Sequence, residues 1–345
     1  MGVIKRGLEF LKDKAKNSNY AIVSFIFRIL LGFIYLTIFV SLSFQVKELI
    51  GSKGLLPIAE LVKNNPSLNY FDFPTLHLFF NSDAALFVLL FIGIIFSITL
   101  ILGYFPRISL IACFAIYLSY VTSGREFFYF QWDNLLLESS FLTLFLPLKG
   151  RLFGKKSLQE SSILLIFLFR WLLFRLYFES GIAKLLYGQN DWLKLSAMKY
   201  YYETAPLPSL GGWFAQQLMP GWFHVTSVFV IFFLELIVPL FLFYPRKLRI
   251  FSFYLLTFFN LIMLTTSNYG FFNFLAIFLG IFLLDDKHIL NFKKINDYFK
   301  NIEIRKASGL GIKLATILIV FIVPFSIFEY IPFAKPNFDM PNFVA

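Results

Sequence analysis

Residues Arg170–Trp213 read RWLLFRLYFESGIAKLLYGQNDWLKLSAMKYYYETAPLPSLGGW, and this stretch decides how the rest of the chain is interpreted. Its first half is apolar enough to cross a membrane, yet it carries Arg170, Arg175, Glu179 and Lys184. A charged side chain at the centre of a bilayer costs about 2.5–3.5 kcal/mol on insertion scales. We therefore expect this helix to turn its charges toward a protected interior, a partner or a substrate.

The composition around that stretch is that of an integral membrane protein. Of the 345 residues, 58% are hydrophobic and 49 are phenylalanine, and the mean hydropathy is +0.73. A membrane crossing takes about 20 apolar residues, and runs approaching this length recur from one end of the chain to the other. No polar segment is long enough to fold as a separate soluble domain. The sequence therefore predicts a single all-α membrane domain.

The apolar runs predict a polytopic transmembrane bundle of about nine spans. The expected spans are 20–44, 84–103, 108–121, 134–148, 161–186, 222–244, 250–265, 270–284 and 314–331. The third, fourth, seventh and eighth are short, so we expect them to be tilted or partly re-entrant. This divides the chain into a basic amphipathic lead over residues 1–19, the membrane domain over 20–331 and a Pro-rich tail over 332–345.

The net charge of +11 follows the topology expected of such a bundle. With the N-terminus in the cytoplasm, 20 of the 31 Lys and Arg residues fall in inner segments, four in spans and seven in outer loops. This distribution obeys the positive-inside rule and places the C-terminus outside. Because the membrane accounts for the basic residues, we expect membrane lipids as partners and no nucleic acid.

Few residues suited to simple catalysis are present. The single cysteine, Cys113, excludes an internal disulfide, and the three histidines, His77, His224 and His288, are scattered along the chain. We therefore predict no metal site, and no cofactor is identified. No outer loop holds an Asn-x-Ser/Thr acceptor, which favours the bacterial cytoplasmic membrane over the endoplasmic reticulum that a eukaryotic chain would occupy.

Carboxylates in other spans are expected to meet the charged helix. Asp133 begins the fourth span, Glu138 lies more than a turn deeper, and Glu235 interrupts an apolar run in the sixth. Arg175 and Glu179 are four residues apart and share a helix face, so they either join these groups or simply neutralise each other. The members of the predicted buried polar cluster are Asp133, Glu138, Arg170, Arg175, Glu179 and Glu235.

Two other residues inside spans carry structural expectations. Arg28, in the first span, should either snorkel to the inner surface or form an interior ion pair. Pro239, in the sixth span, should kink its helix because it lacks a backbone N–H.

Lys184 lies near the outer end of its helix, just before an aromatic loop. Pro206 and Pro208 restrict this loop to extended conformations, and its tyrosines offer rigid amphipathic surface for a lipid or a peptide. We predict an outward-facing cavity with Lys184 as its floor and the loop as its cover. The expected binding residues are Tyr200, Tyr201, Tyr202, Glu203, Trp192, Trp132 and Asn268. The alternative is a snorkelling lysine beneath an interfacial aromatic belt, without a cavity.

Four stretches together resemble the lipase maturation factor family of multi-pass membrane proteins. They are RILLGFIYLTIFVSLSFQVKELIGSKGLLP (28–57), FQWDNLLLESSFLTLFLPL (130–148), RWLLFRLYFESGIAKL (170–185) with YYYETAPLP (200–208), and TTSNYGFFNFLAIFLGIFLLDD (265–286). The resemblance implies a membrane scaffold that helps exported lipases or other secreted clients to mature. Longer family members continue into a soluble domain after the last span, where this sequence has only residues 332–345.

A more distant resemblance concerns Lys184. The run SGIAKL (180–185) followed by NDW (190–192) is similar to the segment of vitamin K-dependent gamma-carboxylases that carries their catalytic lysine. It implies Lys184 as a base in a membrane enzyme acting on a lipid or quinone-like substrate, which is the alternative to a maturation scaffold. A transporter is a third reading, and it would need a continuous polar path from Arg170 to Lys184.

Overall fold

The computed structural model describes residues 19–128, 130–153, 157–187, 191–205, 209–300 and 302–328. The predicted tail over 332–345, and all of the predicted lead except Asn19, lie outside these residues. The long helices are α2 (Ala21–Ser43), α5 (Asp83–Leu102), α6 (Pro106–Gly124), α7 (Gln131–Thr143), α8 (Ile163–Tyr187), α11 (Gly221–Phe232), α12 (Arg246–Thr266), α13 (Phe271–Gly280) and α16 (Gly309–Phe328).

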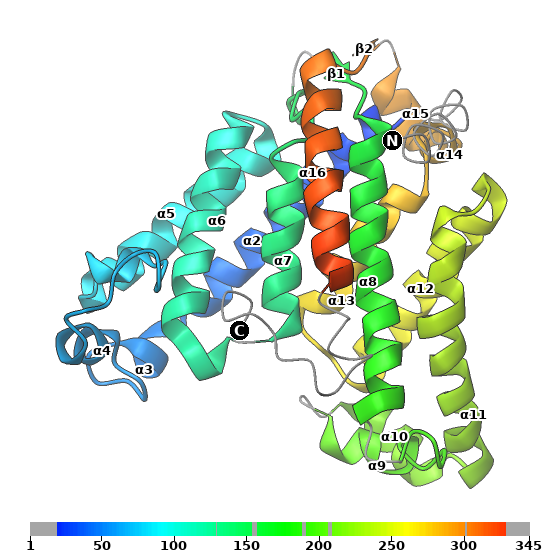
Figure 1. Ribbon diagram of the computed structural model, residues 1–345, viewed down its shortest axis with the longest axis horizontal. Helices are drawn as coiled ribbons and strands as arrows, with labels where there is room; N and C mark the ends of the chain where they lie inside the picture. Colours follow the sequence, from blue (N-terminus) through cyan, green and yellow to red (C-terminus); the bar gives the residue numbers. More distant parts are fainter. Residues whose placement is uncertain are drawn as a thin grey trace.

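Shorter elements connect these helices (Figure 1). The short α-helices are α3 (Val46–Ile50), α4 (Ile58–Asn64), α9 (Met198–Thr204), α10 (Leu210–Leu218), α14 (Asp286–Ile289) and α15 (Lys293–Phe299). Single-turn or tightened helices are η1 (Leu76–Leu78), η2 (Arg125–Phe127), η4 (Val238–Phe243) and η5 (Ile281–Leu283), and η3 (Phe233–Ile237) is π-helical. The prediction of an all-α chain misses one small feature, a parallel pair formed by β1 (Ser157–Gln159) and β2 (Glu303–Arg305).

Six helical segments among the described residues are long and apolar enough to cross a membrane. They are 21–43, 83–102, 106–127, 221–243, 246–266 and 309–328. Helix α8 spans 25 residues but carries the four charged side chains noted above. Helix α7 has 13 residues, which at 1.5 Å per residue reach about 20 Å, less than the hydrocarbon thickness of about 30 Å. The chain is thus a multi-pass helical membrane protein.

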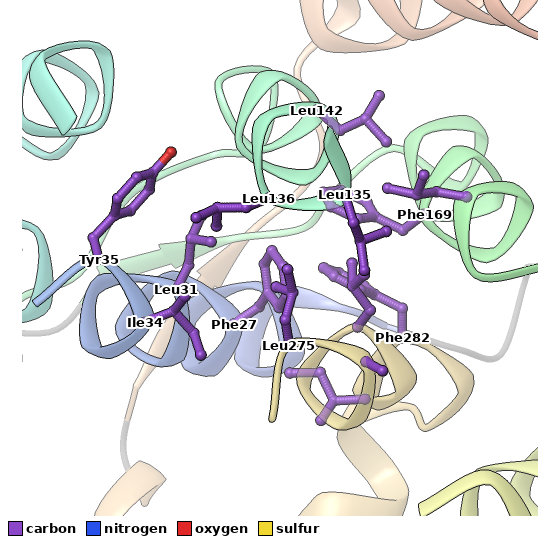
Figure 2. Packing of buried hydrophobic residues seen from close by; sticks show 14 of the residues in the cluster. Phe27, Leu31, Ile34, Tyr35, Leu135, Leu136, Leu142, Phe169, Leu275 and Phe282 are labelled. Carbon is purple, nitrogen blue, oxygen red and sulfur yellow. The ribbon is translucent and has the colours of Figure 1, made fainter. Parts of the chain in front are cut away.

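Aromatic packing forms the centre of the bundle (Figure 2). Phe27 of α2, Phe169 of α8 and Phe282 of η5 are buried against one another, and the Phe169 and Phe282 rings stack with centroids 4.1 Å apart. Leu135 of α7 and Leu275 of α13 add further buried contacts to the same cluster. Three helices that are far apart in the sequence are therefore fixed at one point.

Arg28 is buried close to this centre, and both predictions for it are wrong. Its side chain is 1% exposed, and its Nη1 donates to the carbonyl oxygen of Gly150 at 2.9 Å. The guanidinium also lies 5.0 Å from the Phe25 ring centroid. It can fit there because α5 ends at Gly103, whose φ is +84° and whose missing Cβ would lie 2.4 Å from Arg28 Nη1. Arg28 thus joins the end of α5 to a loop, and no carboxylate takes part in the contacts described.

One end of the bundle gathers the basic segments, and we call it the basic end. It comprises the start of α2, residues 149–153, β1, α14, α15 and β2, drawn at the top of Figure 1. The Asp286 carboxylate accepts hydrogen bonds from the first N–H groups of α2, and Arg246 pairs with Asp285. Tyr298 donates to the carbonyl of Leu152 at 2.6 Å.

The opposite end holds α9 and α10, residues 128 and 130, and the loop 267–270, and we call it the aromatic end. Ser209 donates to the carbonyl of Thr265 at 2.8 Å, which ties the start of α10 to the end of α12. Gly211 and Gly212 permit this approach, because a Cβ on either would lie 2.4 Å from a backbone oxygen of α12. The two ends therefore collect different sets of loops.

Candidate functional site

A cavity of about 660 Å³ lies at the aromatic end, enclosed by α8, α9, α11 and α12. Most of its lining is aromatic or aliphatic. Five of the site residues named from the sequence, Trp132, Lys184, Trp192, Tyr201 and Tyr202, are among the lining residues. Pocket volumes of about 300–1,000 Å³ are usual for small-molecule sites. The cavity is therefore large enough for an acyl chain or a few apolar side chains.

A charged pair forms the polar part of the cavity wall. The Nζ of Lys184 donates to Glu235 Oε2 at 2.7 Å and to Oε1 at 2.8 Å, and it also reaches the carbonyl of Ser180 at 3.3 Å. The side chains of Lys184 and Glu235 are 23% and 8% exposed. An ion pair so shielded is costly to desolvate, and removing one partner leaves the other charge unpaired.

Local backbone features bring these two side chains together. Glu235 lies in the π-helical turn η3, where one extra residue per turn changes the direction of the side chains. On α8, Gly181 lets η3 approach closely, because a Cβ there would lie 2.5 Å from Leu236 and 3.1 Å from the Cβ of Glu235. Pro239, predicted to kink the sixth span, lies in the tightened segment η4 directly after the π-helical turn, so the helix departs from α geometry at this position.

Aromatic rings surround the charged pair. The ring centroid of Trp192 lies 5.2 Å from the Nζ of Lys184, a cation–π distance. The hydroxyls of Tyr201 and Tyr269 share a hydrogen bond, and Trp132 lies 6.2 Å from the Tyr269 ring. Burial raises the pKa of Tyr269, so this phenol is uncharged near neutral pH. The cavity thus offers one charged pair within an aromatic enclosure.

Three of the predicted binding residues lie away from this cavity, contrary to the prediction. Tyr200 is 58% exposed and Glu203 is also exposed, because α9 turns Tyr201 and Tyr202 inward and their neighbours outward. Asn268 has a φ of +46°, and its side chain accepts a hydrogen bond from the Gly270 N–H instead of lining the cavity. Pro206 and Pro208, the predicted restraints on the cover, lie outside the described residues.

The predicted single polar cluster is also wrong, because the structure separates its members. Arg175 pairs with Glu138 at 3.1 Å and with Glu179 at 2.9 Å, whereas Glu235 belongs to Lys184. Nine residues separate Arg175 from Lys184, which puts them about half a turn apart around α8. The helix therefore presents its charges to two different neighbours.

The two remaining members have uncharged partners. Arg170 donates to the hydroxyl of Tyr20 at 2.6 Å and to the carbonyl of Phe282 at 3.0 Å. The Asp133 carboxylate accepts a hydrogen bond from the Tyr117 hydroxyl. Both groups therefore fix helices to one another, at positions separate from the cavity.

The cavity wall that α11 and α12 provide has no counterpart among the residues predicted from the sequence. Val230, Phe233, Phe258 and Ile262 line the cavity, although each side chain is also more than 40% exposed. Their sequence pattern is the same as that of lipid-facing positions, so periodicity alone could not identify them. Asn260, whose Nδ2 donates to the Tyr177 hydroxyl at 2.6 Å, offered a better signal as a polar residue in an apolar run.

The fold and the cavity together define a multi-pass helical membrane protein with a charged pair inside an aromatic cavity. Residues 22–291 match the lipase maturation factor transmembrane domain, so the chain belongs to the lipase maturation factor family. No solved structure matches it.

Named relatives agree with this membership. Lipase maturation factor 2 of Xenopus tropicalis is 40% identical over 276 residues, covering 76% of this chain and 38% of the relative. The human protein of that name is 34% identical, covering 74% and 39%. Human lipase maturation factor 1 is 32% identical, covering 74% and 47%. The chain thus spans less than half the length of these relatives. They are vertebrate proteins and give no support to the expectation of a bacterial membrane.

Proposed function

We propose that this chain assists the maturation of exported proteins such as lipases, and that the cavity beside Lys184 is its working site. The names of its relatives supply the client class. The observation that carries the proposal is the 660 Å³ aromatic cavity with the Lys184–Glu235 pair in its wall. Such a site suits an apolar segment that ends in a polar group, and it is too small for a folded domain.

The geometry weighs against the alternative, in which Lys184 is the base of a membrane enzyme. A base needs a lone pair directed at the substrate, whereas the Nζ here donates to both oxygens of Glu235 and to Ser180. The similarity to gamma-carboxylases would then reflect the shape of the site and not its chemistry.

The proposal includes a topology of nine crossings, with the basic end in the cytoplasm and the aromatic end outside. Three short or charged segments, α7, α8 and α13 with η5, would cross in addition to the six apolar ones. Contacts between distant residues support this count, because an even number of proposed crossings separates the segments that meet at each end. The start of α2 contacts α14, and β1 pairs with β2. The cavity would then face exported clients.

The test is the yield of active secreted lipase from cells that lack their own maturation factor and express this chain. Lys184→Ala should lower the yield at least about tenfold, since it leaves Glu235 buried and unpaired. Lys184→Arg should retain most of the yield, because it keeps the positive charge. Lys194→Ala, an exposed lysine beyond the same helix, is the control. Yields are normalised to the amount of chain in the membrane.

Two outcomes would count against this function. An unchanged yield with Lys184→Ala would remove the cavity from the mechanism. Loss of activity in Lys184→Arg, with normal insertion and folding, would favour the enzyme instead, because a guanidinium does not act as a base at neutral pH.

A further inference from the structure

A second cavity, of about 610 Å³, lies at the basic end, remote from Lys184. It is bounded by the first turns of α6 and α16 and by the segment that follows α7. In Figure 1, α7 is drawn between α6 and α16. Both α6 and α16 belong to apolar segments long enough to span a membrane, so a groove between their exposed faces would open toward lipid.

The apolar wall of this groove is open to the surroundings. Ile108 and Ile111 of α6 are 59% and 53% exposed, and Leu310 of α16 is 67% exposed. Large apolar side chains left exposed around a cavity indicate a binding surface or contact with lipid. Here the same residues line a groove and lie on membrane-spanning segments, so an acyl chain is the apolar group that can reach them.

The polar rim of the groove carries an excess of positive charge. Arg107, in the first turn of α6, and Lys149, after α7, line the cavity with exposed side chains. Glu160 is the carboxylate in the same lining. Within the described residues no hydrogen bond or ion pair occupies the side chain of Arg107 or of Lys149. Two cations beside one carboxylate leave an excess of positive charge. A headgroup with a net negative charge balances this excess, whereas a zwitterionic headgroup has no net charge with which to balance it.

We propose that this groove binds an anionic phospholipid. The phosphate would lie between Arg107 and Lys149, and one acyl chain would follow Ile108, Ile111 and Leu314 into the membrane. A soluble phosphate would leave the apolar wall uncovered, and a phospholipid without net charge would leave the excess positive charge without a partner. Basic residues at the inner membrane surface attract anionic lipids in this way. The site is independent of the cavity beside Lys184.

The test is thermal unfolding of the full chain in an uncharged detergent. Phosphatidylglycerol at about ten times its dissociation constant should raise the unfolding temperature by about 2 °C, and phosphatidylcholine should raise it much less. The double variant Arg107→Ala with Lys149→Ala should lose the shift. Lys47→Ala with Lys63→Ala, which removes two exposed lysines from α3 and α4, is the matched control and should keep it.

Two further variants separate the charge from the groove. Glu160→Gln should enlarge the phosphatidylglycerol shift, because it removes the carboxylate from the lining. Ile111→Trp, which fills the apolar wall and keeps both cations, should reduce the shift. Glycerol 3-phosphate alone should not produce it, and an equal shift with this soluble anion would show an anion site without a lipid. Equal shifts in the two double variants, or with both phospholipids, would overturn the proposal.

Discussion

The buried environment of His77 should make the stability of the protein depend on pH. Its side chain is fully buried in η1, its Nδ1 lies 2.7 Å from the Ser123 hydroxyl, and its ring packs against Tyr120. Its Nε2 is buried without a hydrogen-bond partner among the described residues. Burial lowers the pKa of His77 from 6.5 to about 4, so the folded protein holds a neutral imidazole.

We predict that the protein loses stability as the pH falls from about 7 to 4. The pKa of His77 is lower in the folded state than in the unfolded state. The stability that depends on neutral His77 is therefore fully present above pH 6.5. It declines as the pH falls further, because the unfolded state binds a proton that the folded state does not bind. A shift of this size corresponds to at most about 3 kcal/mol. The unfolding temperature should fall over this interval, and His77→Gln should flatten the fall. An identical pH profile in this variant would show that other groups are responsible.

Residue identities at the cavity could be predicted from the sequence more readily than their pairing. Lys184 and Glu235 stand out because charge is rare in apolar runs. Their contact could not be read off, because the π-helical turn η3 changes the direction in which Glu235 points. The prediction that Tyr200 and Glu203 line the cavity was wrong for a similar reason, because the short helix α9 places neighbouring residues on opposite faces.

The first N–H groups of α2 are bound by a carboxylate from a distant part of the sequence. Asp286, 4% exposed, accepts from the N–H groups of Ala21, Ile22 and Val23 at 2.9–3.1 Å. These groups have no partner inside their own helix, and a carboxylate at a helix N-terminus also meets a favourable dipole. Burial raises the pKa of Asp286, although the three N–H groups oppose the rise. The Asp286 carboxylate therefore caps the N-terminus of α2, a role that a side chain next to the helix in sequence usually fills.

We predict that Asp286→Ala lowers the free energy of unfolding by about 3 kcal/mol or more. The substitution leaves several buried N–H groups without acceptors, and each such group costs about 1–3 kcal/mol. Asp286→Asn should have a smaller effect because one acceptor oxygen remains. Asp297→Ala, at an exposed position on α15 at the same end, should change stability by less than about 0.5 kcal/mol. Similar unfolding temperatures for the Asp286 and Asp297 alanine variants would contradict this role.

Helix existence was easier to predict than helix length or pairing. Each predicted span has a helical counterpart. The fourth and eighth, expected to be short, correspond to α7 and α13, which have 13 and 10 residues. The third and seventh were also expected to be short, but they correspond to segments 106–127 and 246–266, which are long enough to cross a membrane. The β1–β2 pair could not be foreseen, since three-residue strands 146 positions apart leave no periodic pattern. The contact of Asp286 with α2 could not be predicted either, because sequence patterns indicate only helix caps that lie next to the helix in the chain.

At the scale of the whole molecule, the proposed topology can be tested with the chain's own cysteine as an internal control. Cys113 is fully buried in α6, so it should react slowly with maleimides. Lys300→Cys at the basic end and Lys199→Cys at the aromatic end both introduce an exposed thiol. In intact cells or sealed vesicles of one orientation, a membrane-impermeant maleimide should label only one of these two variants. Labelling of both before lysis, or of neither, would contradict nine crossings.

At the scale of the whole molecule, basic segments from distant parts of the sequence lie together. Residues 149–153, 246–249 and 293–300 lie at the end of the bundle where α2 starts. The second cavity was not predicted, because its walls come from α6, α16 and the segment after α7, and only the folded chain brings these together.

The contact between Asp286 and the first helix also has a consequence in time. Asp286 is added to the growing chain 265 residues after Ala21. At about 5–20 residues per second, a ribosome needs about 13–53 s to cover that distance. Throughout this interval α2 exists without its acceptor, whereas β1 waits for β2 over a shorter distance, from Ser157 to Glu303. The first helix of the described residues therefore gains its acceptor only when α14 has been made. A nascent chain interrupted before α14 should leave α2 more open to proteolysis than the finished protein does.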